Sequence, residues 1–263
     1  MVTHFIFMSS SYSLGKRIAM DYIVDDEDIQ EDLKRYLKRI TEECGKDGSI
    51  STHMIQAEDR TWESVCRSDY FFKDVEVINS LDKFIKLIKK DRKLEGIDIA
   101  KYILSKIECT QLKLQKLVYL CFADYLCETG KELFMDPIYA FKYGPVVDTV
   151  YKRYKKYGYK PIDEEKEDIS PTVSEMPAKS RILFAEDGTG KIISIDTTLK
   201  KYGQLTASQL VDLTHRESAP WTMTKKSSWI SFSEIKPEII TKYHKFDRTK
   251  SWKNQKKSAN HWG

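Results

Sequence analysis

The segment TQLKLQKLVYLCFADYLCE, residues 110–128, decides the fold of the larger part of this chain. After its first turn it places apolar residues on nearly every side of a helix, and a helix that is apolar all round lies inside a protein core. Thr110 offers an N-cap hydroxyl at its start, and Gly130 supplies the left-handed residue with which helices commonly end. We therefore predict a central buried helix whose core residues are Leu114, Leu117, Val118, Leu120, Cys121, Phe122, Ala123 and Leu126.

Helical spacing continues on both sides of this segment. Apolar residues from Ile97 to Ile107 recur on one helical face, which predicts an amphipathic helix. Gly144-Pro145 is predicted to open a further helix, because proline suits the first helical position, where its missing N–H costs nothing. Gly158 is predicted to end that helix, and two more are expected at about 197–202 and 206–214.

The region between these helices predicts irregular and β structure. Residues 159–180 are polar and contain three prolines, so we expect a loop. The turn Asp187-Gly188-Thr189-Gly190 separates two apolar runs, 182–185 and 191–195. Glycine-rich turns between such runs are typical of β-hairpins.

The first ninety residues show an α/β pattern. Apolar runs alternate with a helical stripe whose first turn is acidic, as the helix dipole favours. The predicted elements are a strand over 2–8, a serine-rich turn at 9–11, a helix near 25–43, strands at 51–57 and 75–78, and a helix with Ser80 as N-cap.

A charged stretch, KKDRKLEG at 89–96, marks the predicted domain boundary. We expect an N-terminal α/β domain over 1–93, a mainly α-helical domain over 97–246 with a short β-hairpin, and a basic, disordered tail over 247–263. The fold class is therefore α+β.

Composition and charge narrow the classes of function. The chain has 263 residues, 41% of them hydrophobic, and no apolar stretch approaches the 18 residues of a membrane span. We expect no signal peptide, and five cysteines without a CxxC motif indicate reduced thiols and a cytoplasmic location. From residue 242 onward seven Lys or Arg face one Asp, so this segment carries +6 and the rest of the chain −2, which is unlike a nucleic-acid groove on the folded body.

Two glycine–lysine motifs are candidates for phosphate binding. Gly15 and Lys16 follow a predicted strand and precede an expected helix, where a phosphate loop would stand. However, Ser10 and Arg17 occupy positions that such a loop gives to glycine and to a metal-binding hydroxyl. We interpret this motif as a polar turn, and the motif at 188–191 as a tight turn.

Other catalytic constellations are weaker still. The five histidines are far apart in the sequence, and no metal site or cofactor is predicted from them. Cys121 with His215 could form a nucleophile–base pair, but a thiol on a buried helix behaves as a small hydrophobe. The tail 242–257 could contact nucleic acid nonspecifically through phosphates, although a solvated tail is commoner.

Three segments in fixed order carry a family resemblance: LKLQKLVY at 112–119, YAFKYGPVV at 139–147 and LTHRESAPW at 213–221. Together they resemble the Panacea domain, also called the SocA-like or phage-associated GepA-type antitoxin domain, over about residues 97–223. Tyr139-Ala140-Phe141 departs from the Glu-Ala-Trp that the family shows in the second segment.

This resemblance implies a bacterial antitoxin without catalysis. It implies a cognate toxin protein as partner, bound directly, and in some members delivery to a protease or chaperone. The residues that carry the signature are expected to maintain the fold more than to contact the toxin, with Gln115 bonding a nearby backbone group and Gly144 allowing a close approach. They are Lys113, Gln115, Lys116, Tyr143, Gly144, Pro145, His215, Glu217, Pro220 and Trp221.

Toxin choice is then expected to depend on variable surface, namely residues 1–93 and the loop at 159–195. Two alternatives stay open. A DNA-binding autoregulator would use the basic tail, although no helix-turn-helix is evident. A nucleotide-binding enzyme would depend on Gly15 and Lys16.

Overall fold

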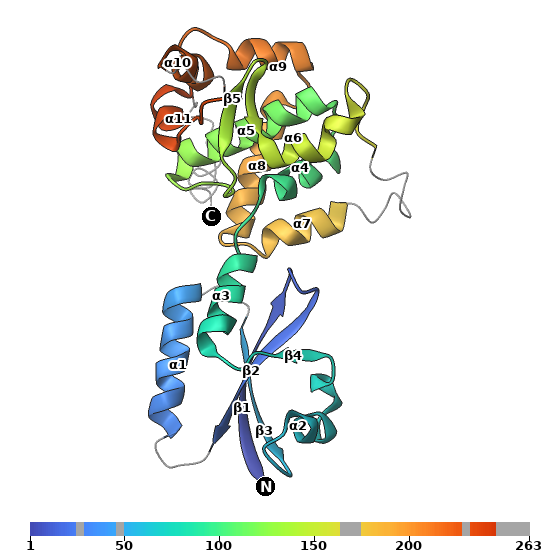
Figure 1. Ribbon diagram of the computed structural model, residues 1–263, viewed down its shortest axis with the longest axis vertical. Coiled ribbons are helices and arrows are strands. Elements are labelled where there is room, and N and C mark those ends of the chain that lie inside the picture. The colour runs from blue at the N-terminus through green and yellow to red at the C-terminus, as the bar shows by residue number, and fades with distance from the viewer. Residues whose placement is uncertain (25–28, 46–49, 164–174, 228–231, 246–263) are drawn as a thin grey trace, which may run out of the picture. The chain divides into compact units, whose positions relative to one another are not determined.

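The computed structural model describes residues 1–24, 29–45, 50–163, 175–227 and 232–245. The chain divides into two compact units, Met1–Lys93 and Leu94–Gly263. The first is a four-stranded sheet with helices, and the second is mainly helical with one β-hairpin (Figure 1). The predicted α+β class is confirmed.

The first unit is built on a mixed sheet in the order β3-β1-β2-β4. The long strand β1 (Val2–Ser11) pairs antiparallel with β2 (Lys16–Val24) and with β3 (Ser51–Ala57). The short strand β4 (Val75–Val77) runs parallel to β2.

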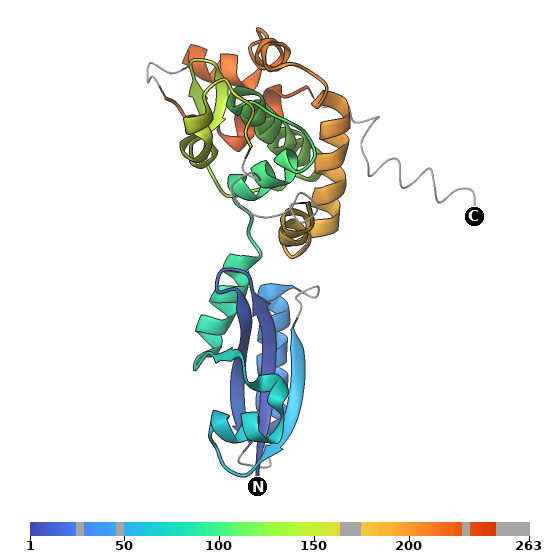
Figure 2. The same ribbon diagram turned by 90° about the vertical axis from the view of Figure 1, so that its right-hand side faces the viewer.

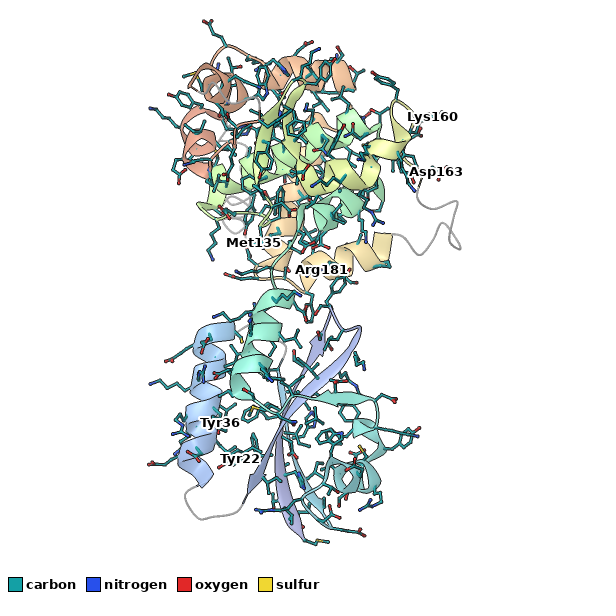
Figure 3. The ribbon with its side chains drawn as sticks, in the orientation of Figure 1. Tyr22, Tyr36, Met135, Lys160, Asp163 and Arg181 are labelled. Carbon is teal, nitrogen blue, oxygen red and sulfur yellow. The ribbon has the colours of Figure 1, made fainter. Side chains whose placement is uncertain are left out.

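Helices cover both faces of this sheet, as Figure 1 shows for α1 (Ile29–Cys44) and α3 (Leu81–Asp91) on one side and α2 (Trp62–Ser68) on the other. Successive residues of a strand point to opposite faces. Phe7 accordingly packs against α1 and α3, whereas Ile6 and Met8 pack towards α2 and the short helix η1 (Tyr70–Phe72). Tyr22 of β2 lies edge-on to Tyr36 of α1, with 5.4 Å between ring centroids (Figure 3).

The predicted strands at 2–8 and 51–57 are confirmed, and the predicted strand at 75–78 ends at Val77. The serine-rich turn at 9–11 is wrong, because Ser9–Ser11 continue β1 opposite Lys16–Ile18. The helix expected after Lys16 is also wrong, since β2 begins there. Sequence periodicity missed β2 and α2; Ser80 does precede α3, but its side chain makes no capping hydrogen bond.

The centre of the second unit is α5 (Gln111–Thr129), in agreement with the prediction. The Thr110 side chain accepts a hydrogen bond from the backbone N–H of Lys113, and Gly130 ends the helix at φ +73°. The helix contacts α4 (Gly96–Leu104), α6 (Asp148–Tyr154), α8 (Gly188–Tyr202), α9 (Ala207–Thr214) and α11 (Pro237–Tyr243) (Figure 2).

A short hairpin completes the core of this unit. Strands β5 (Ile138–Phe141) and β6 (Gly144–Val147) pair antiparallel, and β6 packs on α5. The remaining elements are the short helix η2 (Lys155–Tyr157), α7 (Glu175–Leu183) and α10 (Pro220–Ser227). Arg181 of α7 forms an ion pair with Asp98 of α4 at 3.4 Å, and both side chains are nearly buried (Figure 3).

Two predictions in this unit are wrong. Pro145 does not begin a helix but lies in β6 opposite Ala140, and the helix begins at Asp148. Proline is tolerated in strands at sheet edges, and β6 pairs only with β5.

The second error concerns the hairpin predicted at 182–195. Ile182 lies in α7, and residues 188–195 lie in α8; both Ile182 and Ile195 are fully buried. Ile192, Ile195 and Leu199 have the i, i+3, i+7 spacing of a helix face. The β-branched side chains of Ile192 and Ile195 favour a strand when they are considered without their neighbours in the fold. The predicted loop at 159–180 is partly wrong as well, because α7 begins at Glu175.

Among the described residues, no helix combines the length and apolar character that crossing a bilayer requires. The predicted tail at 247–263 lies outside the described residues.

Candidate functional site

The three signature segments of the sequence meet at one place in the helical unit, around Gly144. A Cβ atom added to Gly144 would lie 2.9 Å from Lys116 Cε and 3.1 Å from His215 Cε1. Gly144 belongs to β6, Lys116 to α5, and His215 is the C-cap of α9. One residue from each segment thus takes part in a single contact.

Gln115 fastens β6 to α5. Its side-chain Nε2 donates to the carbonyl oxygen of Val147 at 3.3 Å, and its Oε1 accepts from the N–H of Val147 at 2.9 Å. The buried side-chain amide therefore satisfies both polar backbone groups of one strand residue, as a neighbouring strand would. The expectation that Gln115 bonds a nearby backbone group is confirmed.

Lys116 is buried completely, which is rare for a lysine side chain. Its Nζ donates to the carbonyl oxygen of Pro145 at 3.0 Å, while Lys113 is only half-buried. Burial disfavours the charged ammonium and lowers the pKa of Lys116 to about 7. Burial therefore favours the neutral, hydrogen-bonded amine at pH values where a lysine at the surface would be fully charged.

His215 and Trp221 close the site from the opposite side. The Nδ1 of His215 lies 2.7 Å from the carbonyl oxygen of Val211, so the proton on that nitrogen is donated to the last turn of α9. The two rings stand 3.8 Å apart between centroids. The Nε1–H of Trp221 donates to the carbonyl oxygen of Phe141 at 2.8 Å, which ties the start of α10 to the end of β5.

Replacing Trp221 with phenylalanine is expected to lower the free energy of unfolding of this unit by about 1–2 kcal/mol, because the carbonyl of Phe141 loses its donor. Trp62→Phe is the matched control: the buried Nε1 of Trp62 has no partner among the described residues, so the same ring change removes no bond. Chemical denaturation measures both. Equal losses would show that ring size, and not the hydrogen bond, matters at Trp221.

The remaining signature residues divide by exposure. Pro145 and Pro220 are buried, the latter as the first residue of α10. Tyr143 is 61% exposed at the tip of the β5–β6 hairpin, and Glu217 is exposed in the α9–α10 turn. Most of the signature therefore holds the hairpin, α5 and the α9–α10 turn together, and only these two residues present much side chain to solvent.

The catalytic candidates do not form a site among the described residues. Gly15 has φ +65° in the turn between β1 and β2, and Lys16 pairs with Glu76 at 3.1 Å. No helix N-terminus follows this turn, so the anion-binding geometry of a phosphate loop does not form there. Cys121 is fully buried and burial raises the pKa of its thiol. No group of three or more His, Cys, Asp or Glu in the described ranges is placed to hold a metal ion.

Sequence analysis missed a buried polar cluster beside α5. His244 Nε2 lies 2.6 Å from Asp124 Oδ1, and the Thr198 hydroxyl donates to Asp124 Oδ2 at 3.0 Å. All three residues are nearly or fully buried. The only signal in the sequence was an isolated carboxylate in an otherwise apolar stretch.

Comparison with known proteins finds a protein family that part of the helical unit resembles. Residues 114–222, which include all three signature segments except Leu112 and Lys113, match the family described as "Antitoxin SocA-like, Panacea domain". The helical unit is thus similar to the Panacea domain over these residues, and the resemblance drawn from the three motifs is confirmed.

A particular relative is the antitoxin SocA of Caulobacter vibrioides (strain NA1000 / CB15N). The two sequences are 31% identical over 117 residues, which are 44% of this chain and 59% of SocA. The chain thus spans less than two thirds of that relative. No solved structure matches.

Proposed function

We propose that this protein is an antitoxin that neutralises a cognate protein toxin by direct binding. The observation that carries the proposal is the similarity to the antitoxin SocA over 117 residues that contain the signature segments. The structure adds a physical reason to expect binding of a partner without catalysis. The buried signature residues make hydrogen bonds that join α5, the β5–β6 hairpin and α10.

The buried signature residues also restrict where a toxin would bind. Gln115 and Lys116 have no exposed surface to offer, so the contact falls to exposed side chains. Tyr143 is the foremost candidate in the Panacea domain, because an exposed tyrosine offers a large contact area and a hydroxyl at low entropic cost.

Toxin choice is assigned, as part of the same proposal, to the first unit. It exposes large apolar side chains at Met54, Tyr70 and Phe71, and aromatic residues are enriched in protein interfaces. Residues 159–195 were also expected to recognise the toxin. Residues 182–195 belong largely to buried helices, so this expected role is restricted to the residues before 182. Residues 164–174 lie outside the described residues.

The test is co-expression with the neighbouring reading frame. We expect that frame to arrest growth alone, the full chain to restore growth, and the two proteins to co-purify. Tyr143→Ala should weaken rescue at unchanged antitoxin level, whereas Lys160→Ala, at another exposed position, should not. A neighbouring frame that is harmless when expressed alone would contradict the proposal.

Toxin abundance during rescue tests the mode of neutralisation. A constant toxin level supports direct inhibition by binding, and a fall that requires a cellular protease supports delivery instead. Exchanging residues 1–93 for the corresponding region of another Panacea protein should change which toxin is neutralised. If the exchanged protein still neutralises the same toxin, the proposal that the first unit determines toxin choice is contradicted.

A further inference from the structure

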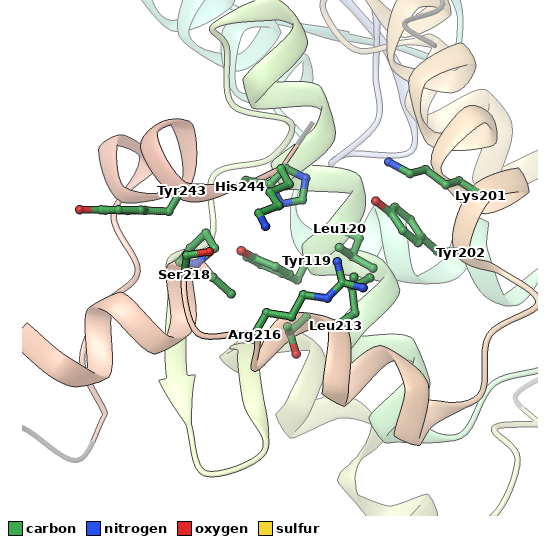
Figure 4. A pocket seen from close by; sticks show the side chains of 13 residues that line it. Tyr119, Leu120, Lys201, Tyr202, Leu213, Arg216, Ser218, Tyr243 and His244 are labelled. Carbon is green, nitrogen blue, oxygen red and sulfur yellow. The ribbon is translucent and has the colours of Figure 1, made fainter. Parts of the chain in front are cut away.

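A cavity of about 300 Å³ lies in the helical unit beside α5 (Figure 4). Its walls come from α5, the end of α8, the α9–α10 turn and the end of α11. This volume lies within the range of sites for small molecules. The lining residues include Tyr119, Lys201, Tyr202, Arg216, His244 and Lys245.

The cavity gathers positive charge without a compensating acid. Lys201, Arg216 and Lys245 line it, and none of the lining residues is an Asp or Glu. Within the described ranges none of these three forms an ion pair with a carboxylate; the Lys201 ammonium stands 4.6 Å above the ring of Tyr202. Asp124, the carboxylate that contacts the lining residue His244, is already engaged by His244 and Thr198.

A buried hydroxyl is the second, independent feature. Tyr119 lines the cavity, is 2% exposed, and its hydroxyl has no hydrogen-bond partner among the described residues. In Figure 4 its hydroxyl points into the space between Ser218 and His244, while the ring of Tyr243 extends away. Buried hydroxyls in proteins are almost always paired, because an unpaired one costs free energy. An oxygen atom of a ligand would supply the missing partner.

We propose that this cavity binds a phosphorylated small molecule with a flat ring, of the nucleotide class. Three cations suit a phosphate, which carries close to two negative charges near neutral pH, better than a single carboxylate. The apolar faces of Tyr119, Tyr202 and Leu213 offer walls against which a ring can pack. The proposal concerns binding only and is independent of the antitoxin role, since it depends on the cavity alone.

The test is calorimetric titration of the full chain with AMP as probe. Adenosine and inorganic phosphate each supply half of the ligand and should bind at least about tenfold more weakly than AMP, because each loses one set of contacts. A titration with a 5′-phosphorylated oligonucleotide shows whether the site takes a free nucleotide or the phosphorylated end of a nucleic-acid strand. Binding of AMP alone indicates a free metabolite, and equal binding of both indicates the end of a nucleic-acid strand; either supports the site.

Variants then locate the binding. Arg216→Gln and Lys201→Gln should each weaken AMP binding by about tenfold, as expected for loss of one charge-assisted hydrogen bond. Lys200→Gln removes the same charge from the neighbouring position of α8 without touching the cavity, so it should leave the affinity unchanged. Tyr119→Phe should weaken binding while the melting temperature of the free protein stays equal or rises, because it removes an unpaired hydroxyl.

Three results would overturn the site. The first is no saturable binding of any probe at millimolar concentration. The second is an equal loss in the Lys200 and Lys201 variants, which would indicate diffuse attraction to a basic protein. The third is a lower melting temperature of Tyr119→Phe with AMP affinity intact, which would give that hydroxyl a structural role.

Discussion

Replacing Gly144 with alanine should destabilise the helical unit by about 2–5 kcal/mol. Two costs add. Gly144 has φ +104°, where side chains other than hydrogen are strained. The new Cβ would also lie 2.9 Å from Lys116 Cε and 3.0 Å from its Nζ. Lys116 cannot move aside freely, because it is fully buried and donates to Pro145.

Gly130→Ala separates these two costs. Gly130 has φ +73° at the end of α5, but a Cβ there would meet no atom within 4 Å. It should therefore cost only the backbone strain, about 1–2 kcal/mol. Native-state hydrogen exchange of α5 amides reports the opening of this unit by itself. If both substitutions lower protection equally, the close approach of β6 to Lys116 and His215 is not what requires glycine at 144.

The parts of the fold that the sequence predicted depend on local chemistry. Thr110 and Gly130 delimit α5 through a hydroxyl and a left-handed backbone, both of which act within one helical turn. The uniformly apolar stretch between them required burial wherever the rest of the chain went. The helix expected at 206–214 also begins with local chemistry, because Thr206 is the N-cap of α9 and forms a capping box with Gln209, although the sequence analysis did not single out this cap.

The errors arose where contacts distant in the sequence decide the outcome. Pro145 is in a strand because Gln115 and Lys116, 30 residues or so earlier, hold β6 through Val147 and Pro145. Ile182 and Ile195 entered helices because α7 and α8 pack on α4 and α5. Neither the hydrogen bonds from α5 nor the packing of α7 and α8 can be read from the spacing of apolar residues around Pro145, Ile182 or Ile195.

The candidate cavity could not be predicted for the same reason. Tyr119 belongs to the helix that was predicted to be buried but was not among its predicted core residues, and its unpaired hydroxyl is visible only once its neighbours are placed. Nothing in the sequence around Lys201, Arg216 and Lys245 distinguishes them from lysines and arginines that are simply exposed to solvent. Their meeting follows from the packing of α8, the α9–α10 turn and α11 around α5.

The buried Lys116 should make the stability of the helical unit depend on pH. In the unfolded chain its pKa is near 10.5, whereas burial lowers the folded-state pKa to about 7. Between these values the unfolded state binds more protons, so stability rises with pH. The contribution is complete above the unfolded pKa and is lost as pH falls towards about 7; below that value it stays constant.

Lys116→Met isolates this contribution. The wild type should gain about 2 kcal/mol between about pH 6.5 and 8.5 relative to the variant, whose side chain does not titrate. This window lies largely below the range in which cysteine and tyrosine side chains ionise in the unfolded chain. Lys113→Met is the matched control one turn earlier on α5, and it should retain the rise because the buried amine remains. Unfolding free energies measured across this range decide the matter: parallel curves for the wild type and Lys116→Met would mean that Lys116 keeps its charge inside the core.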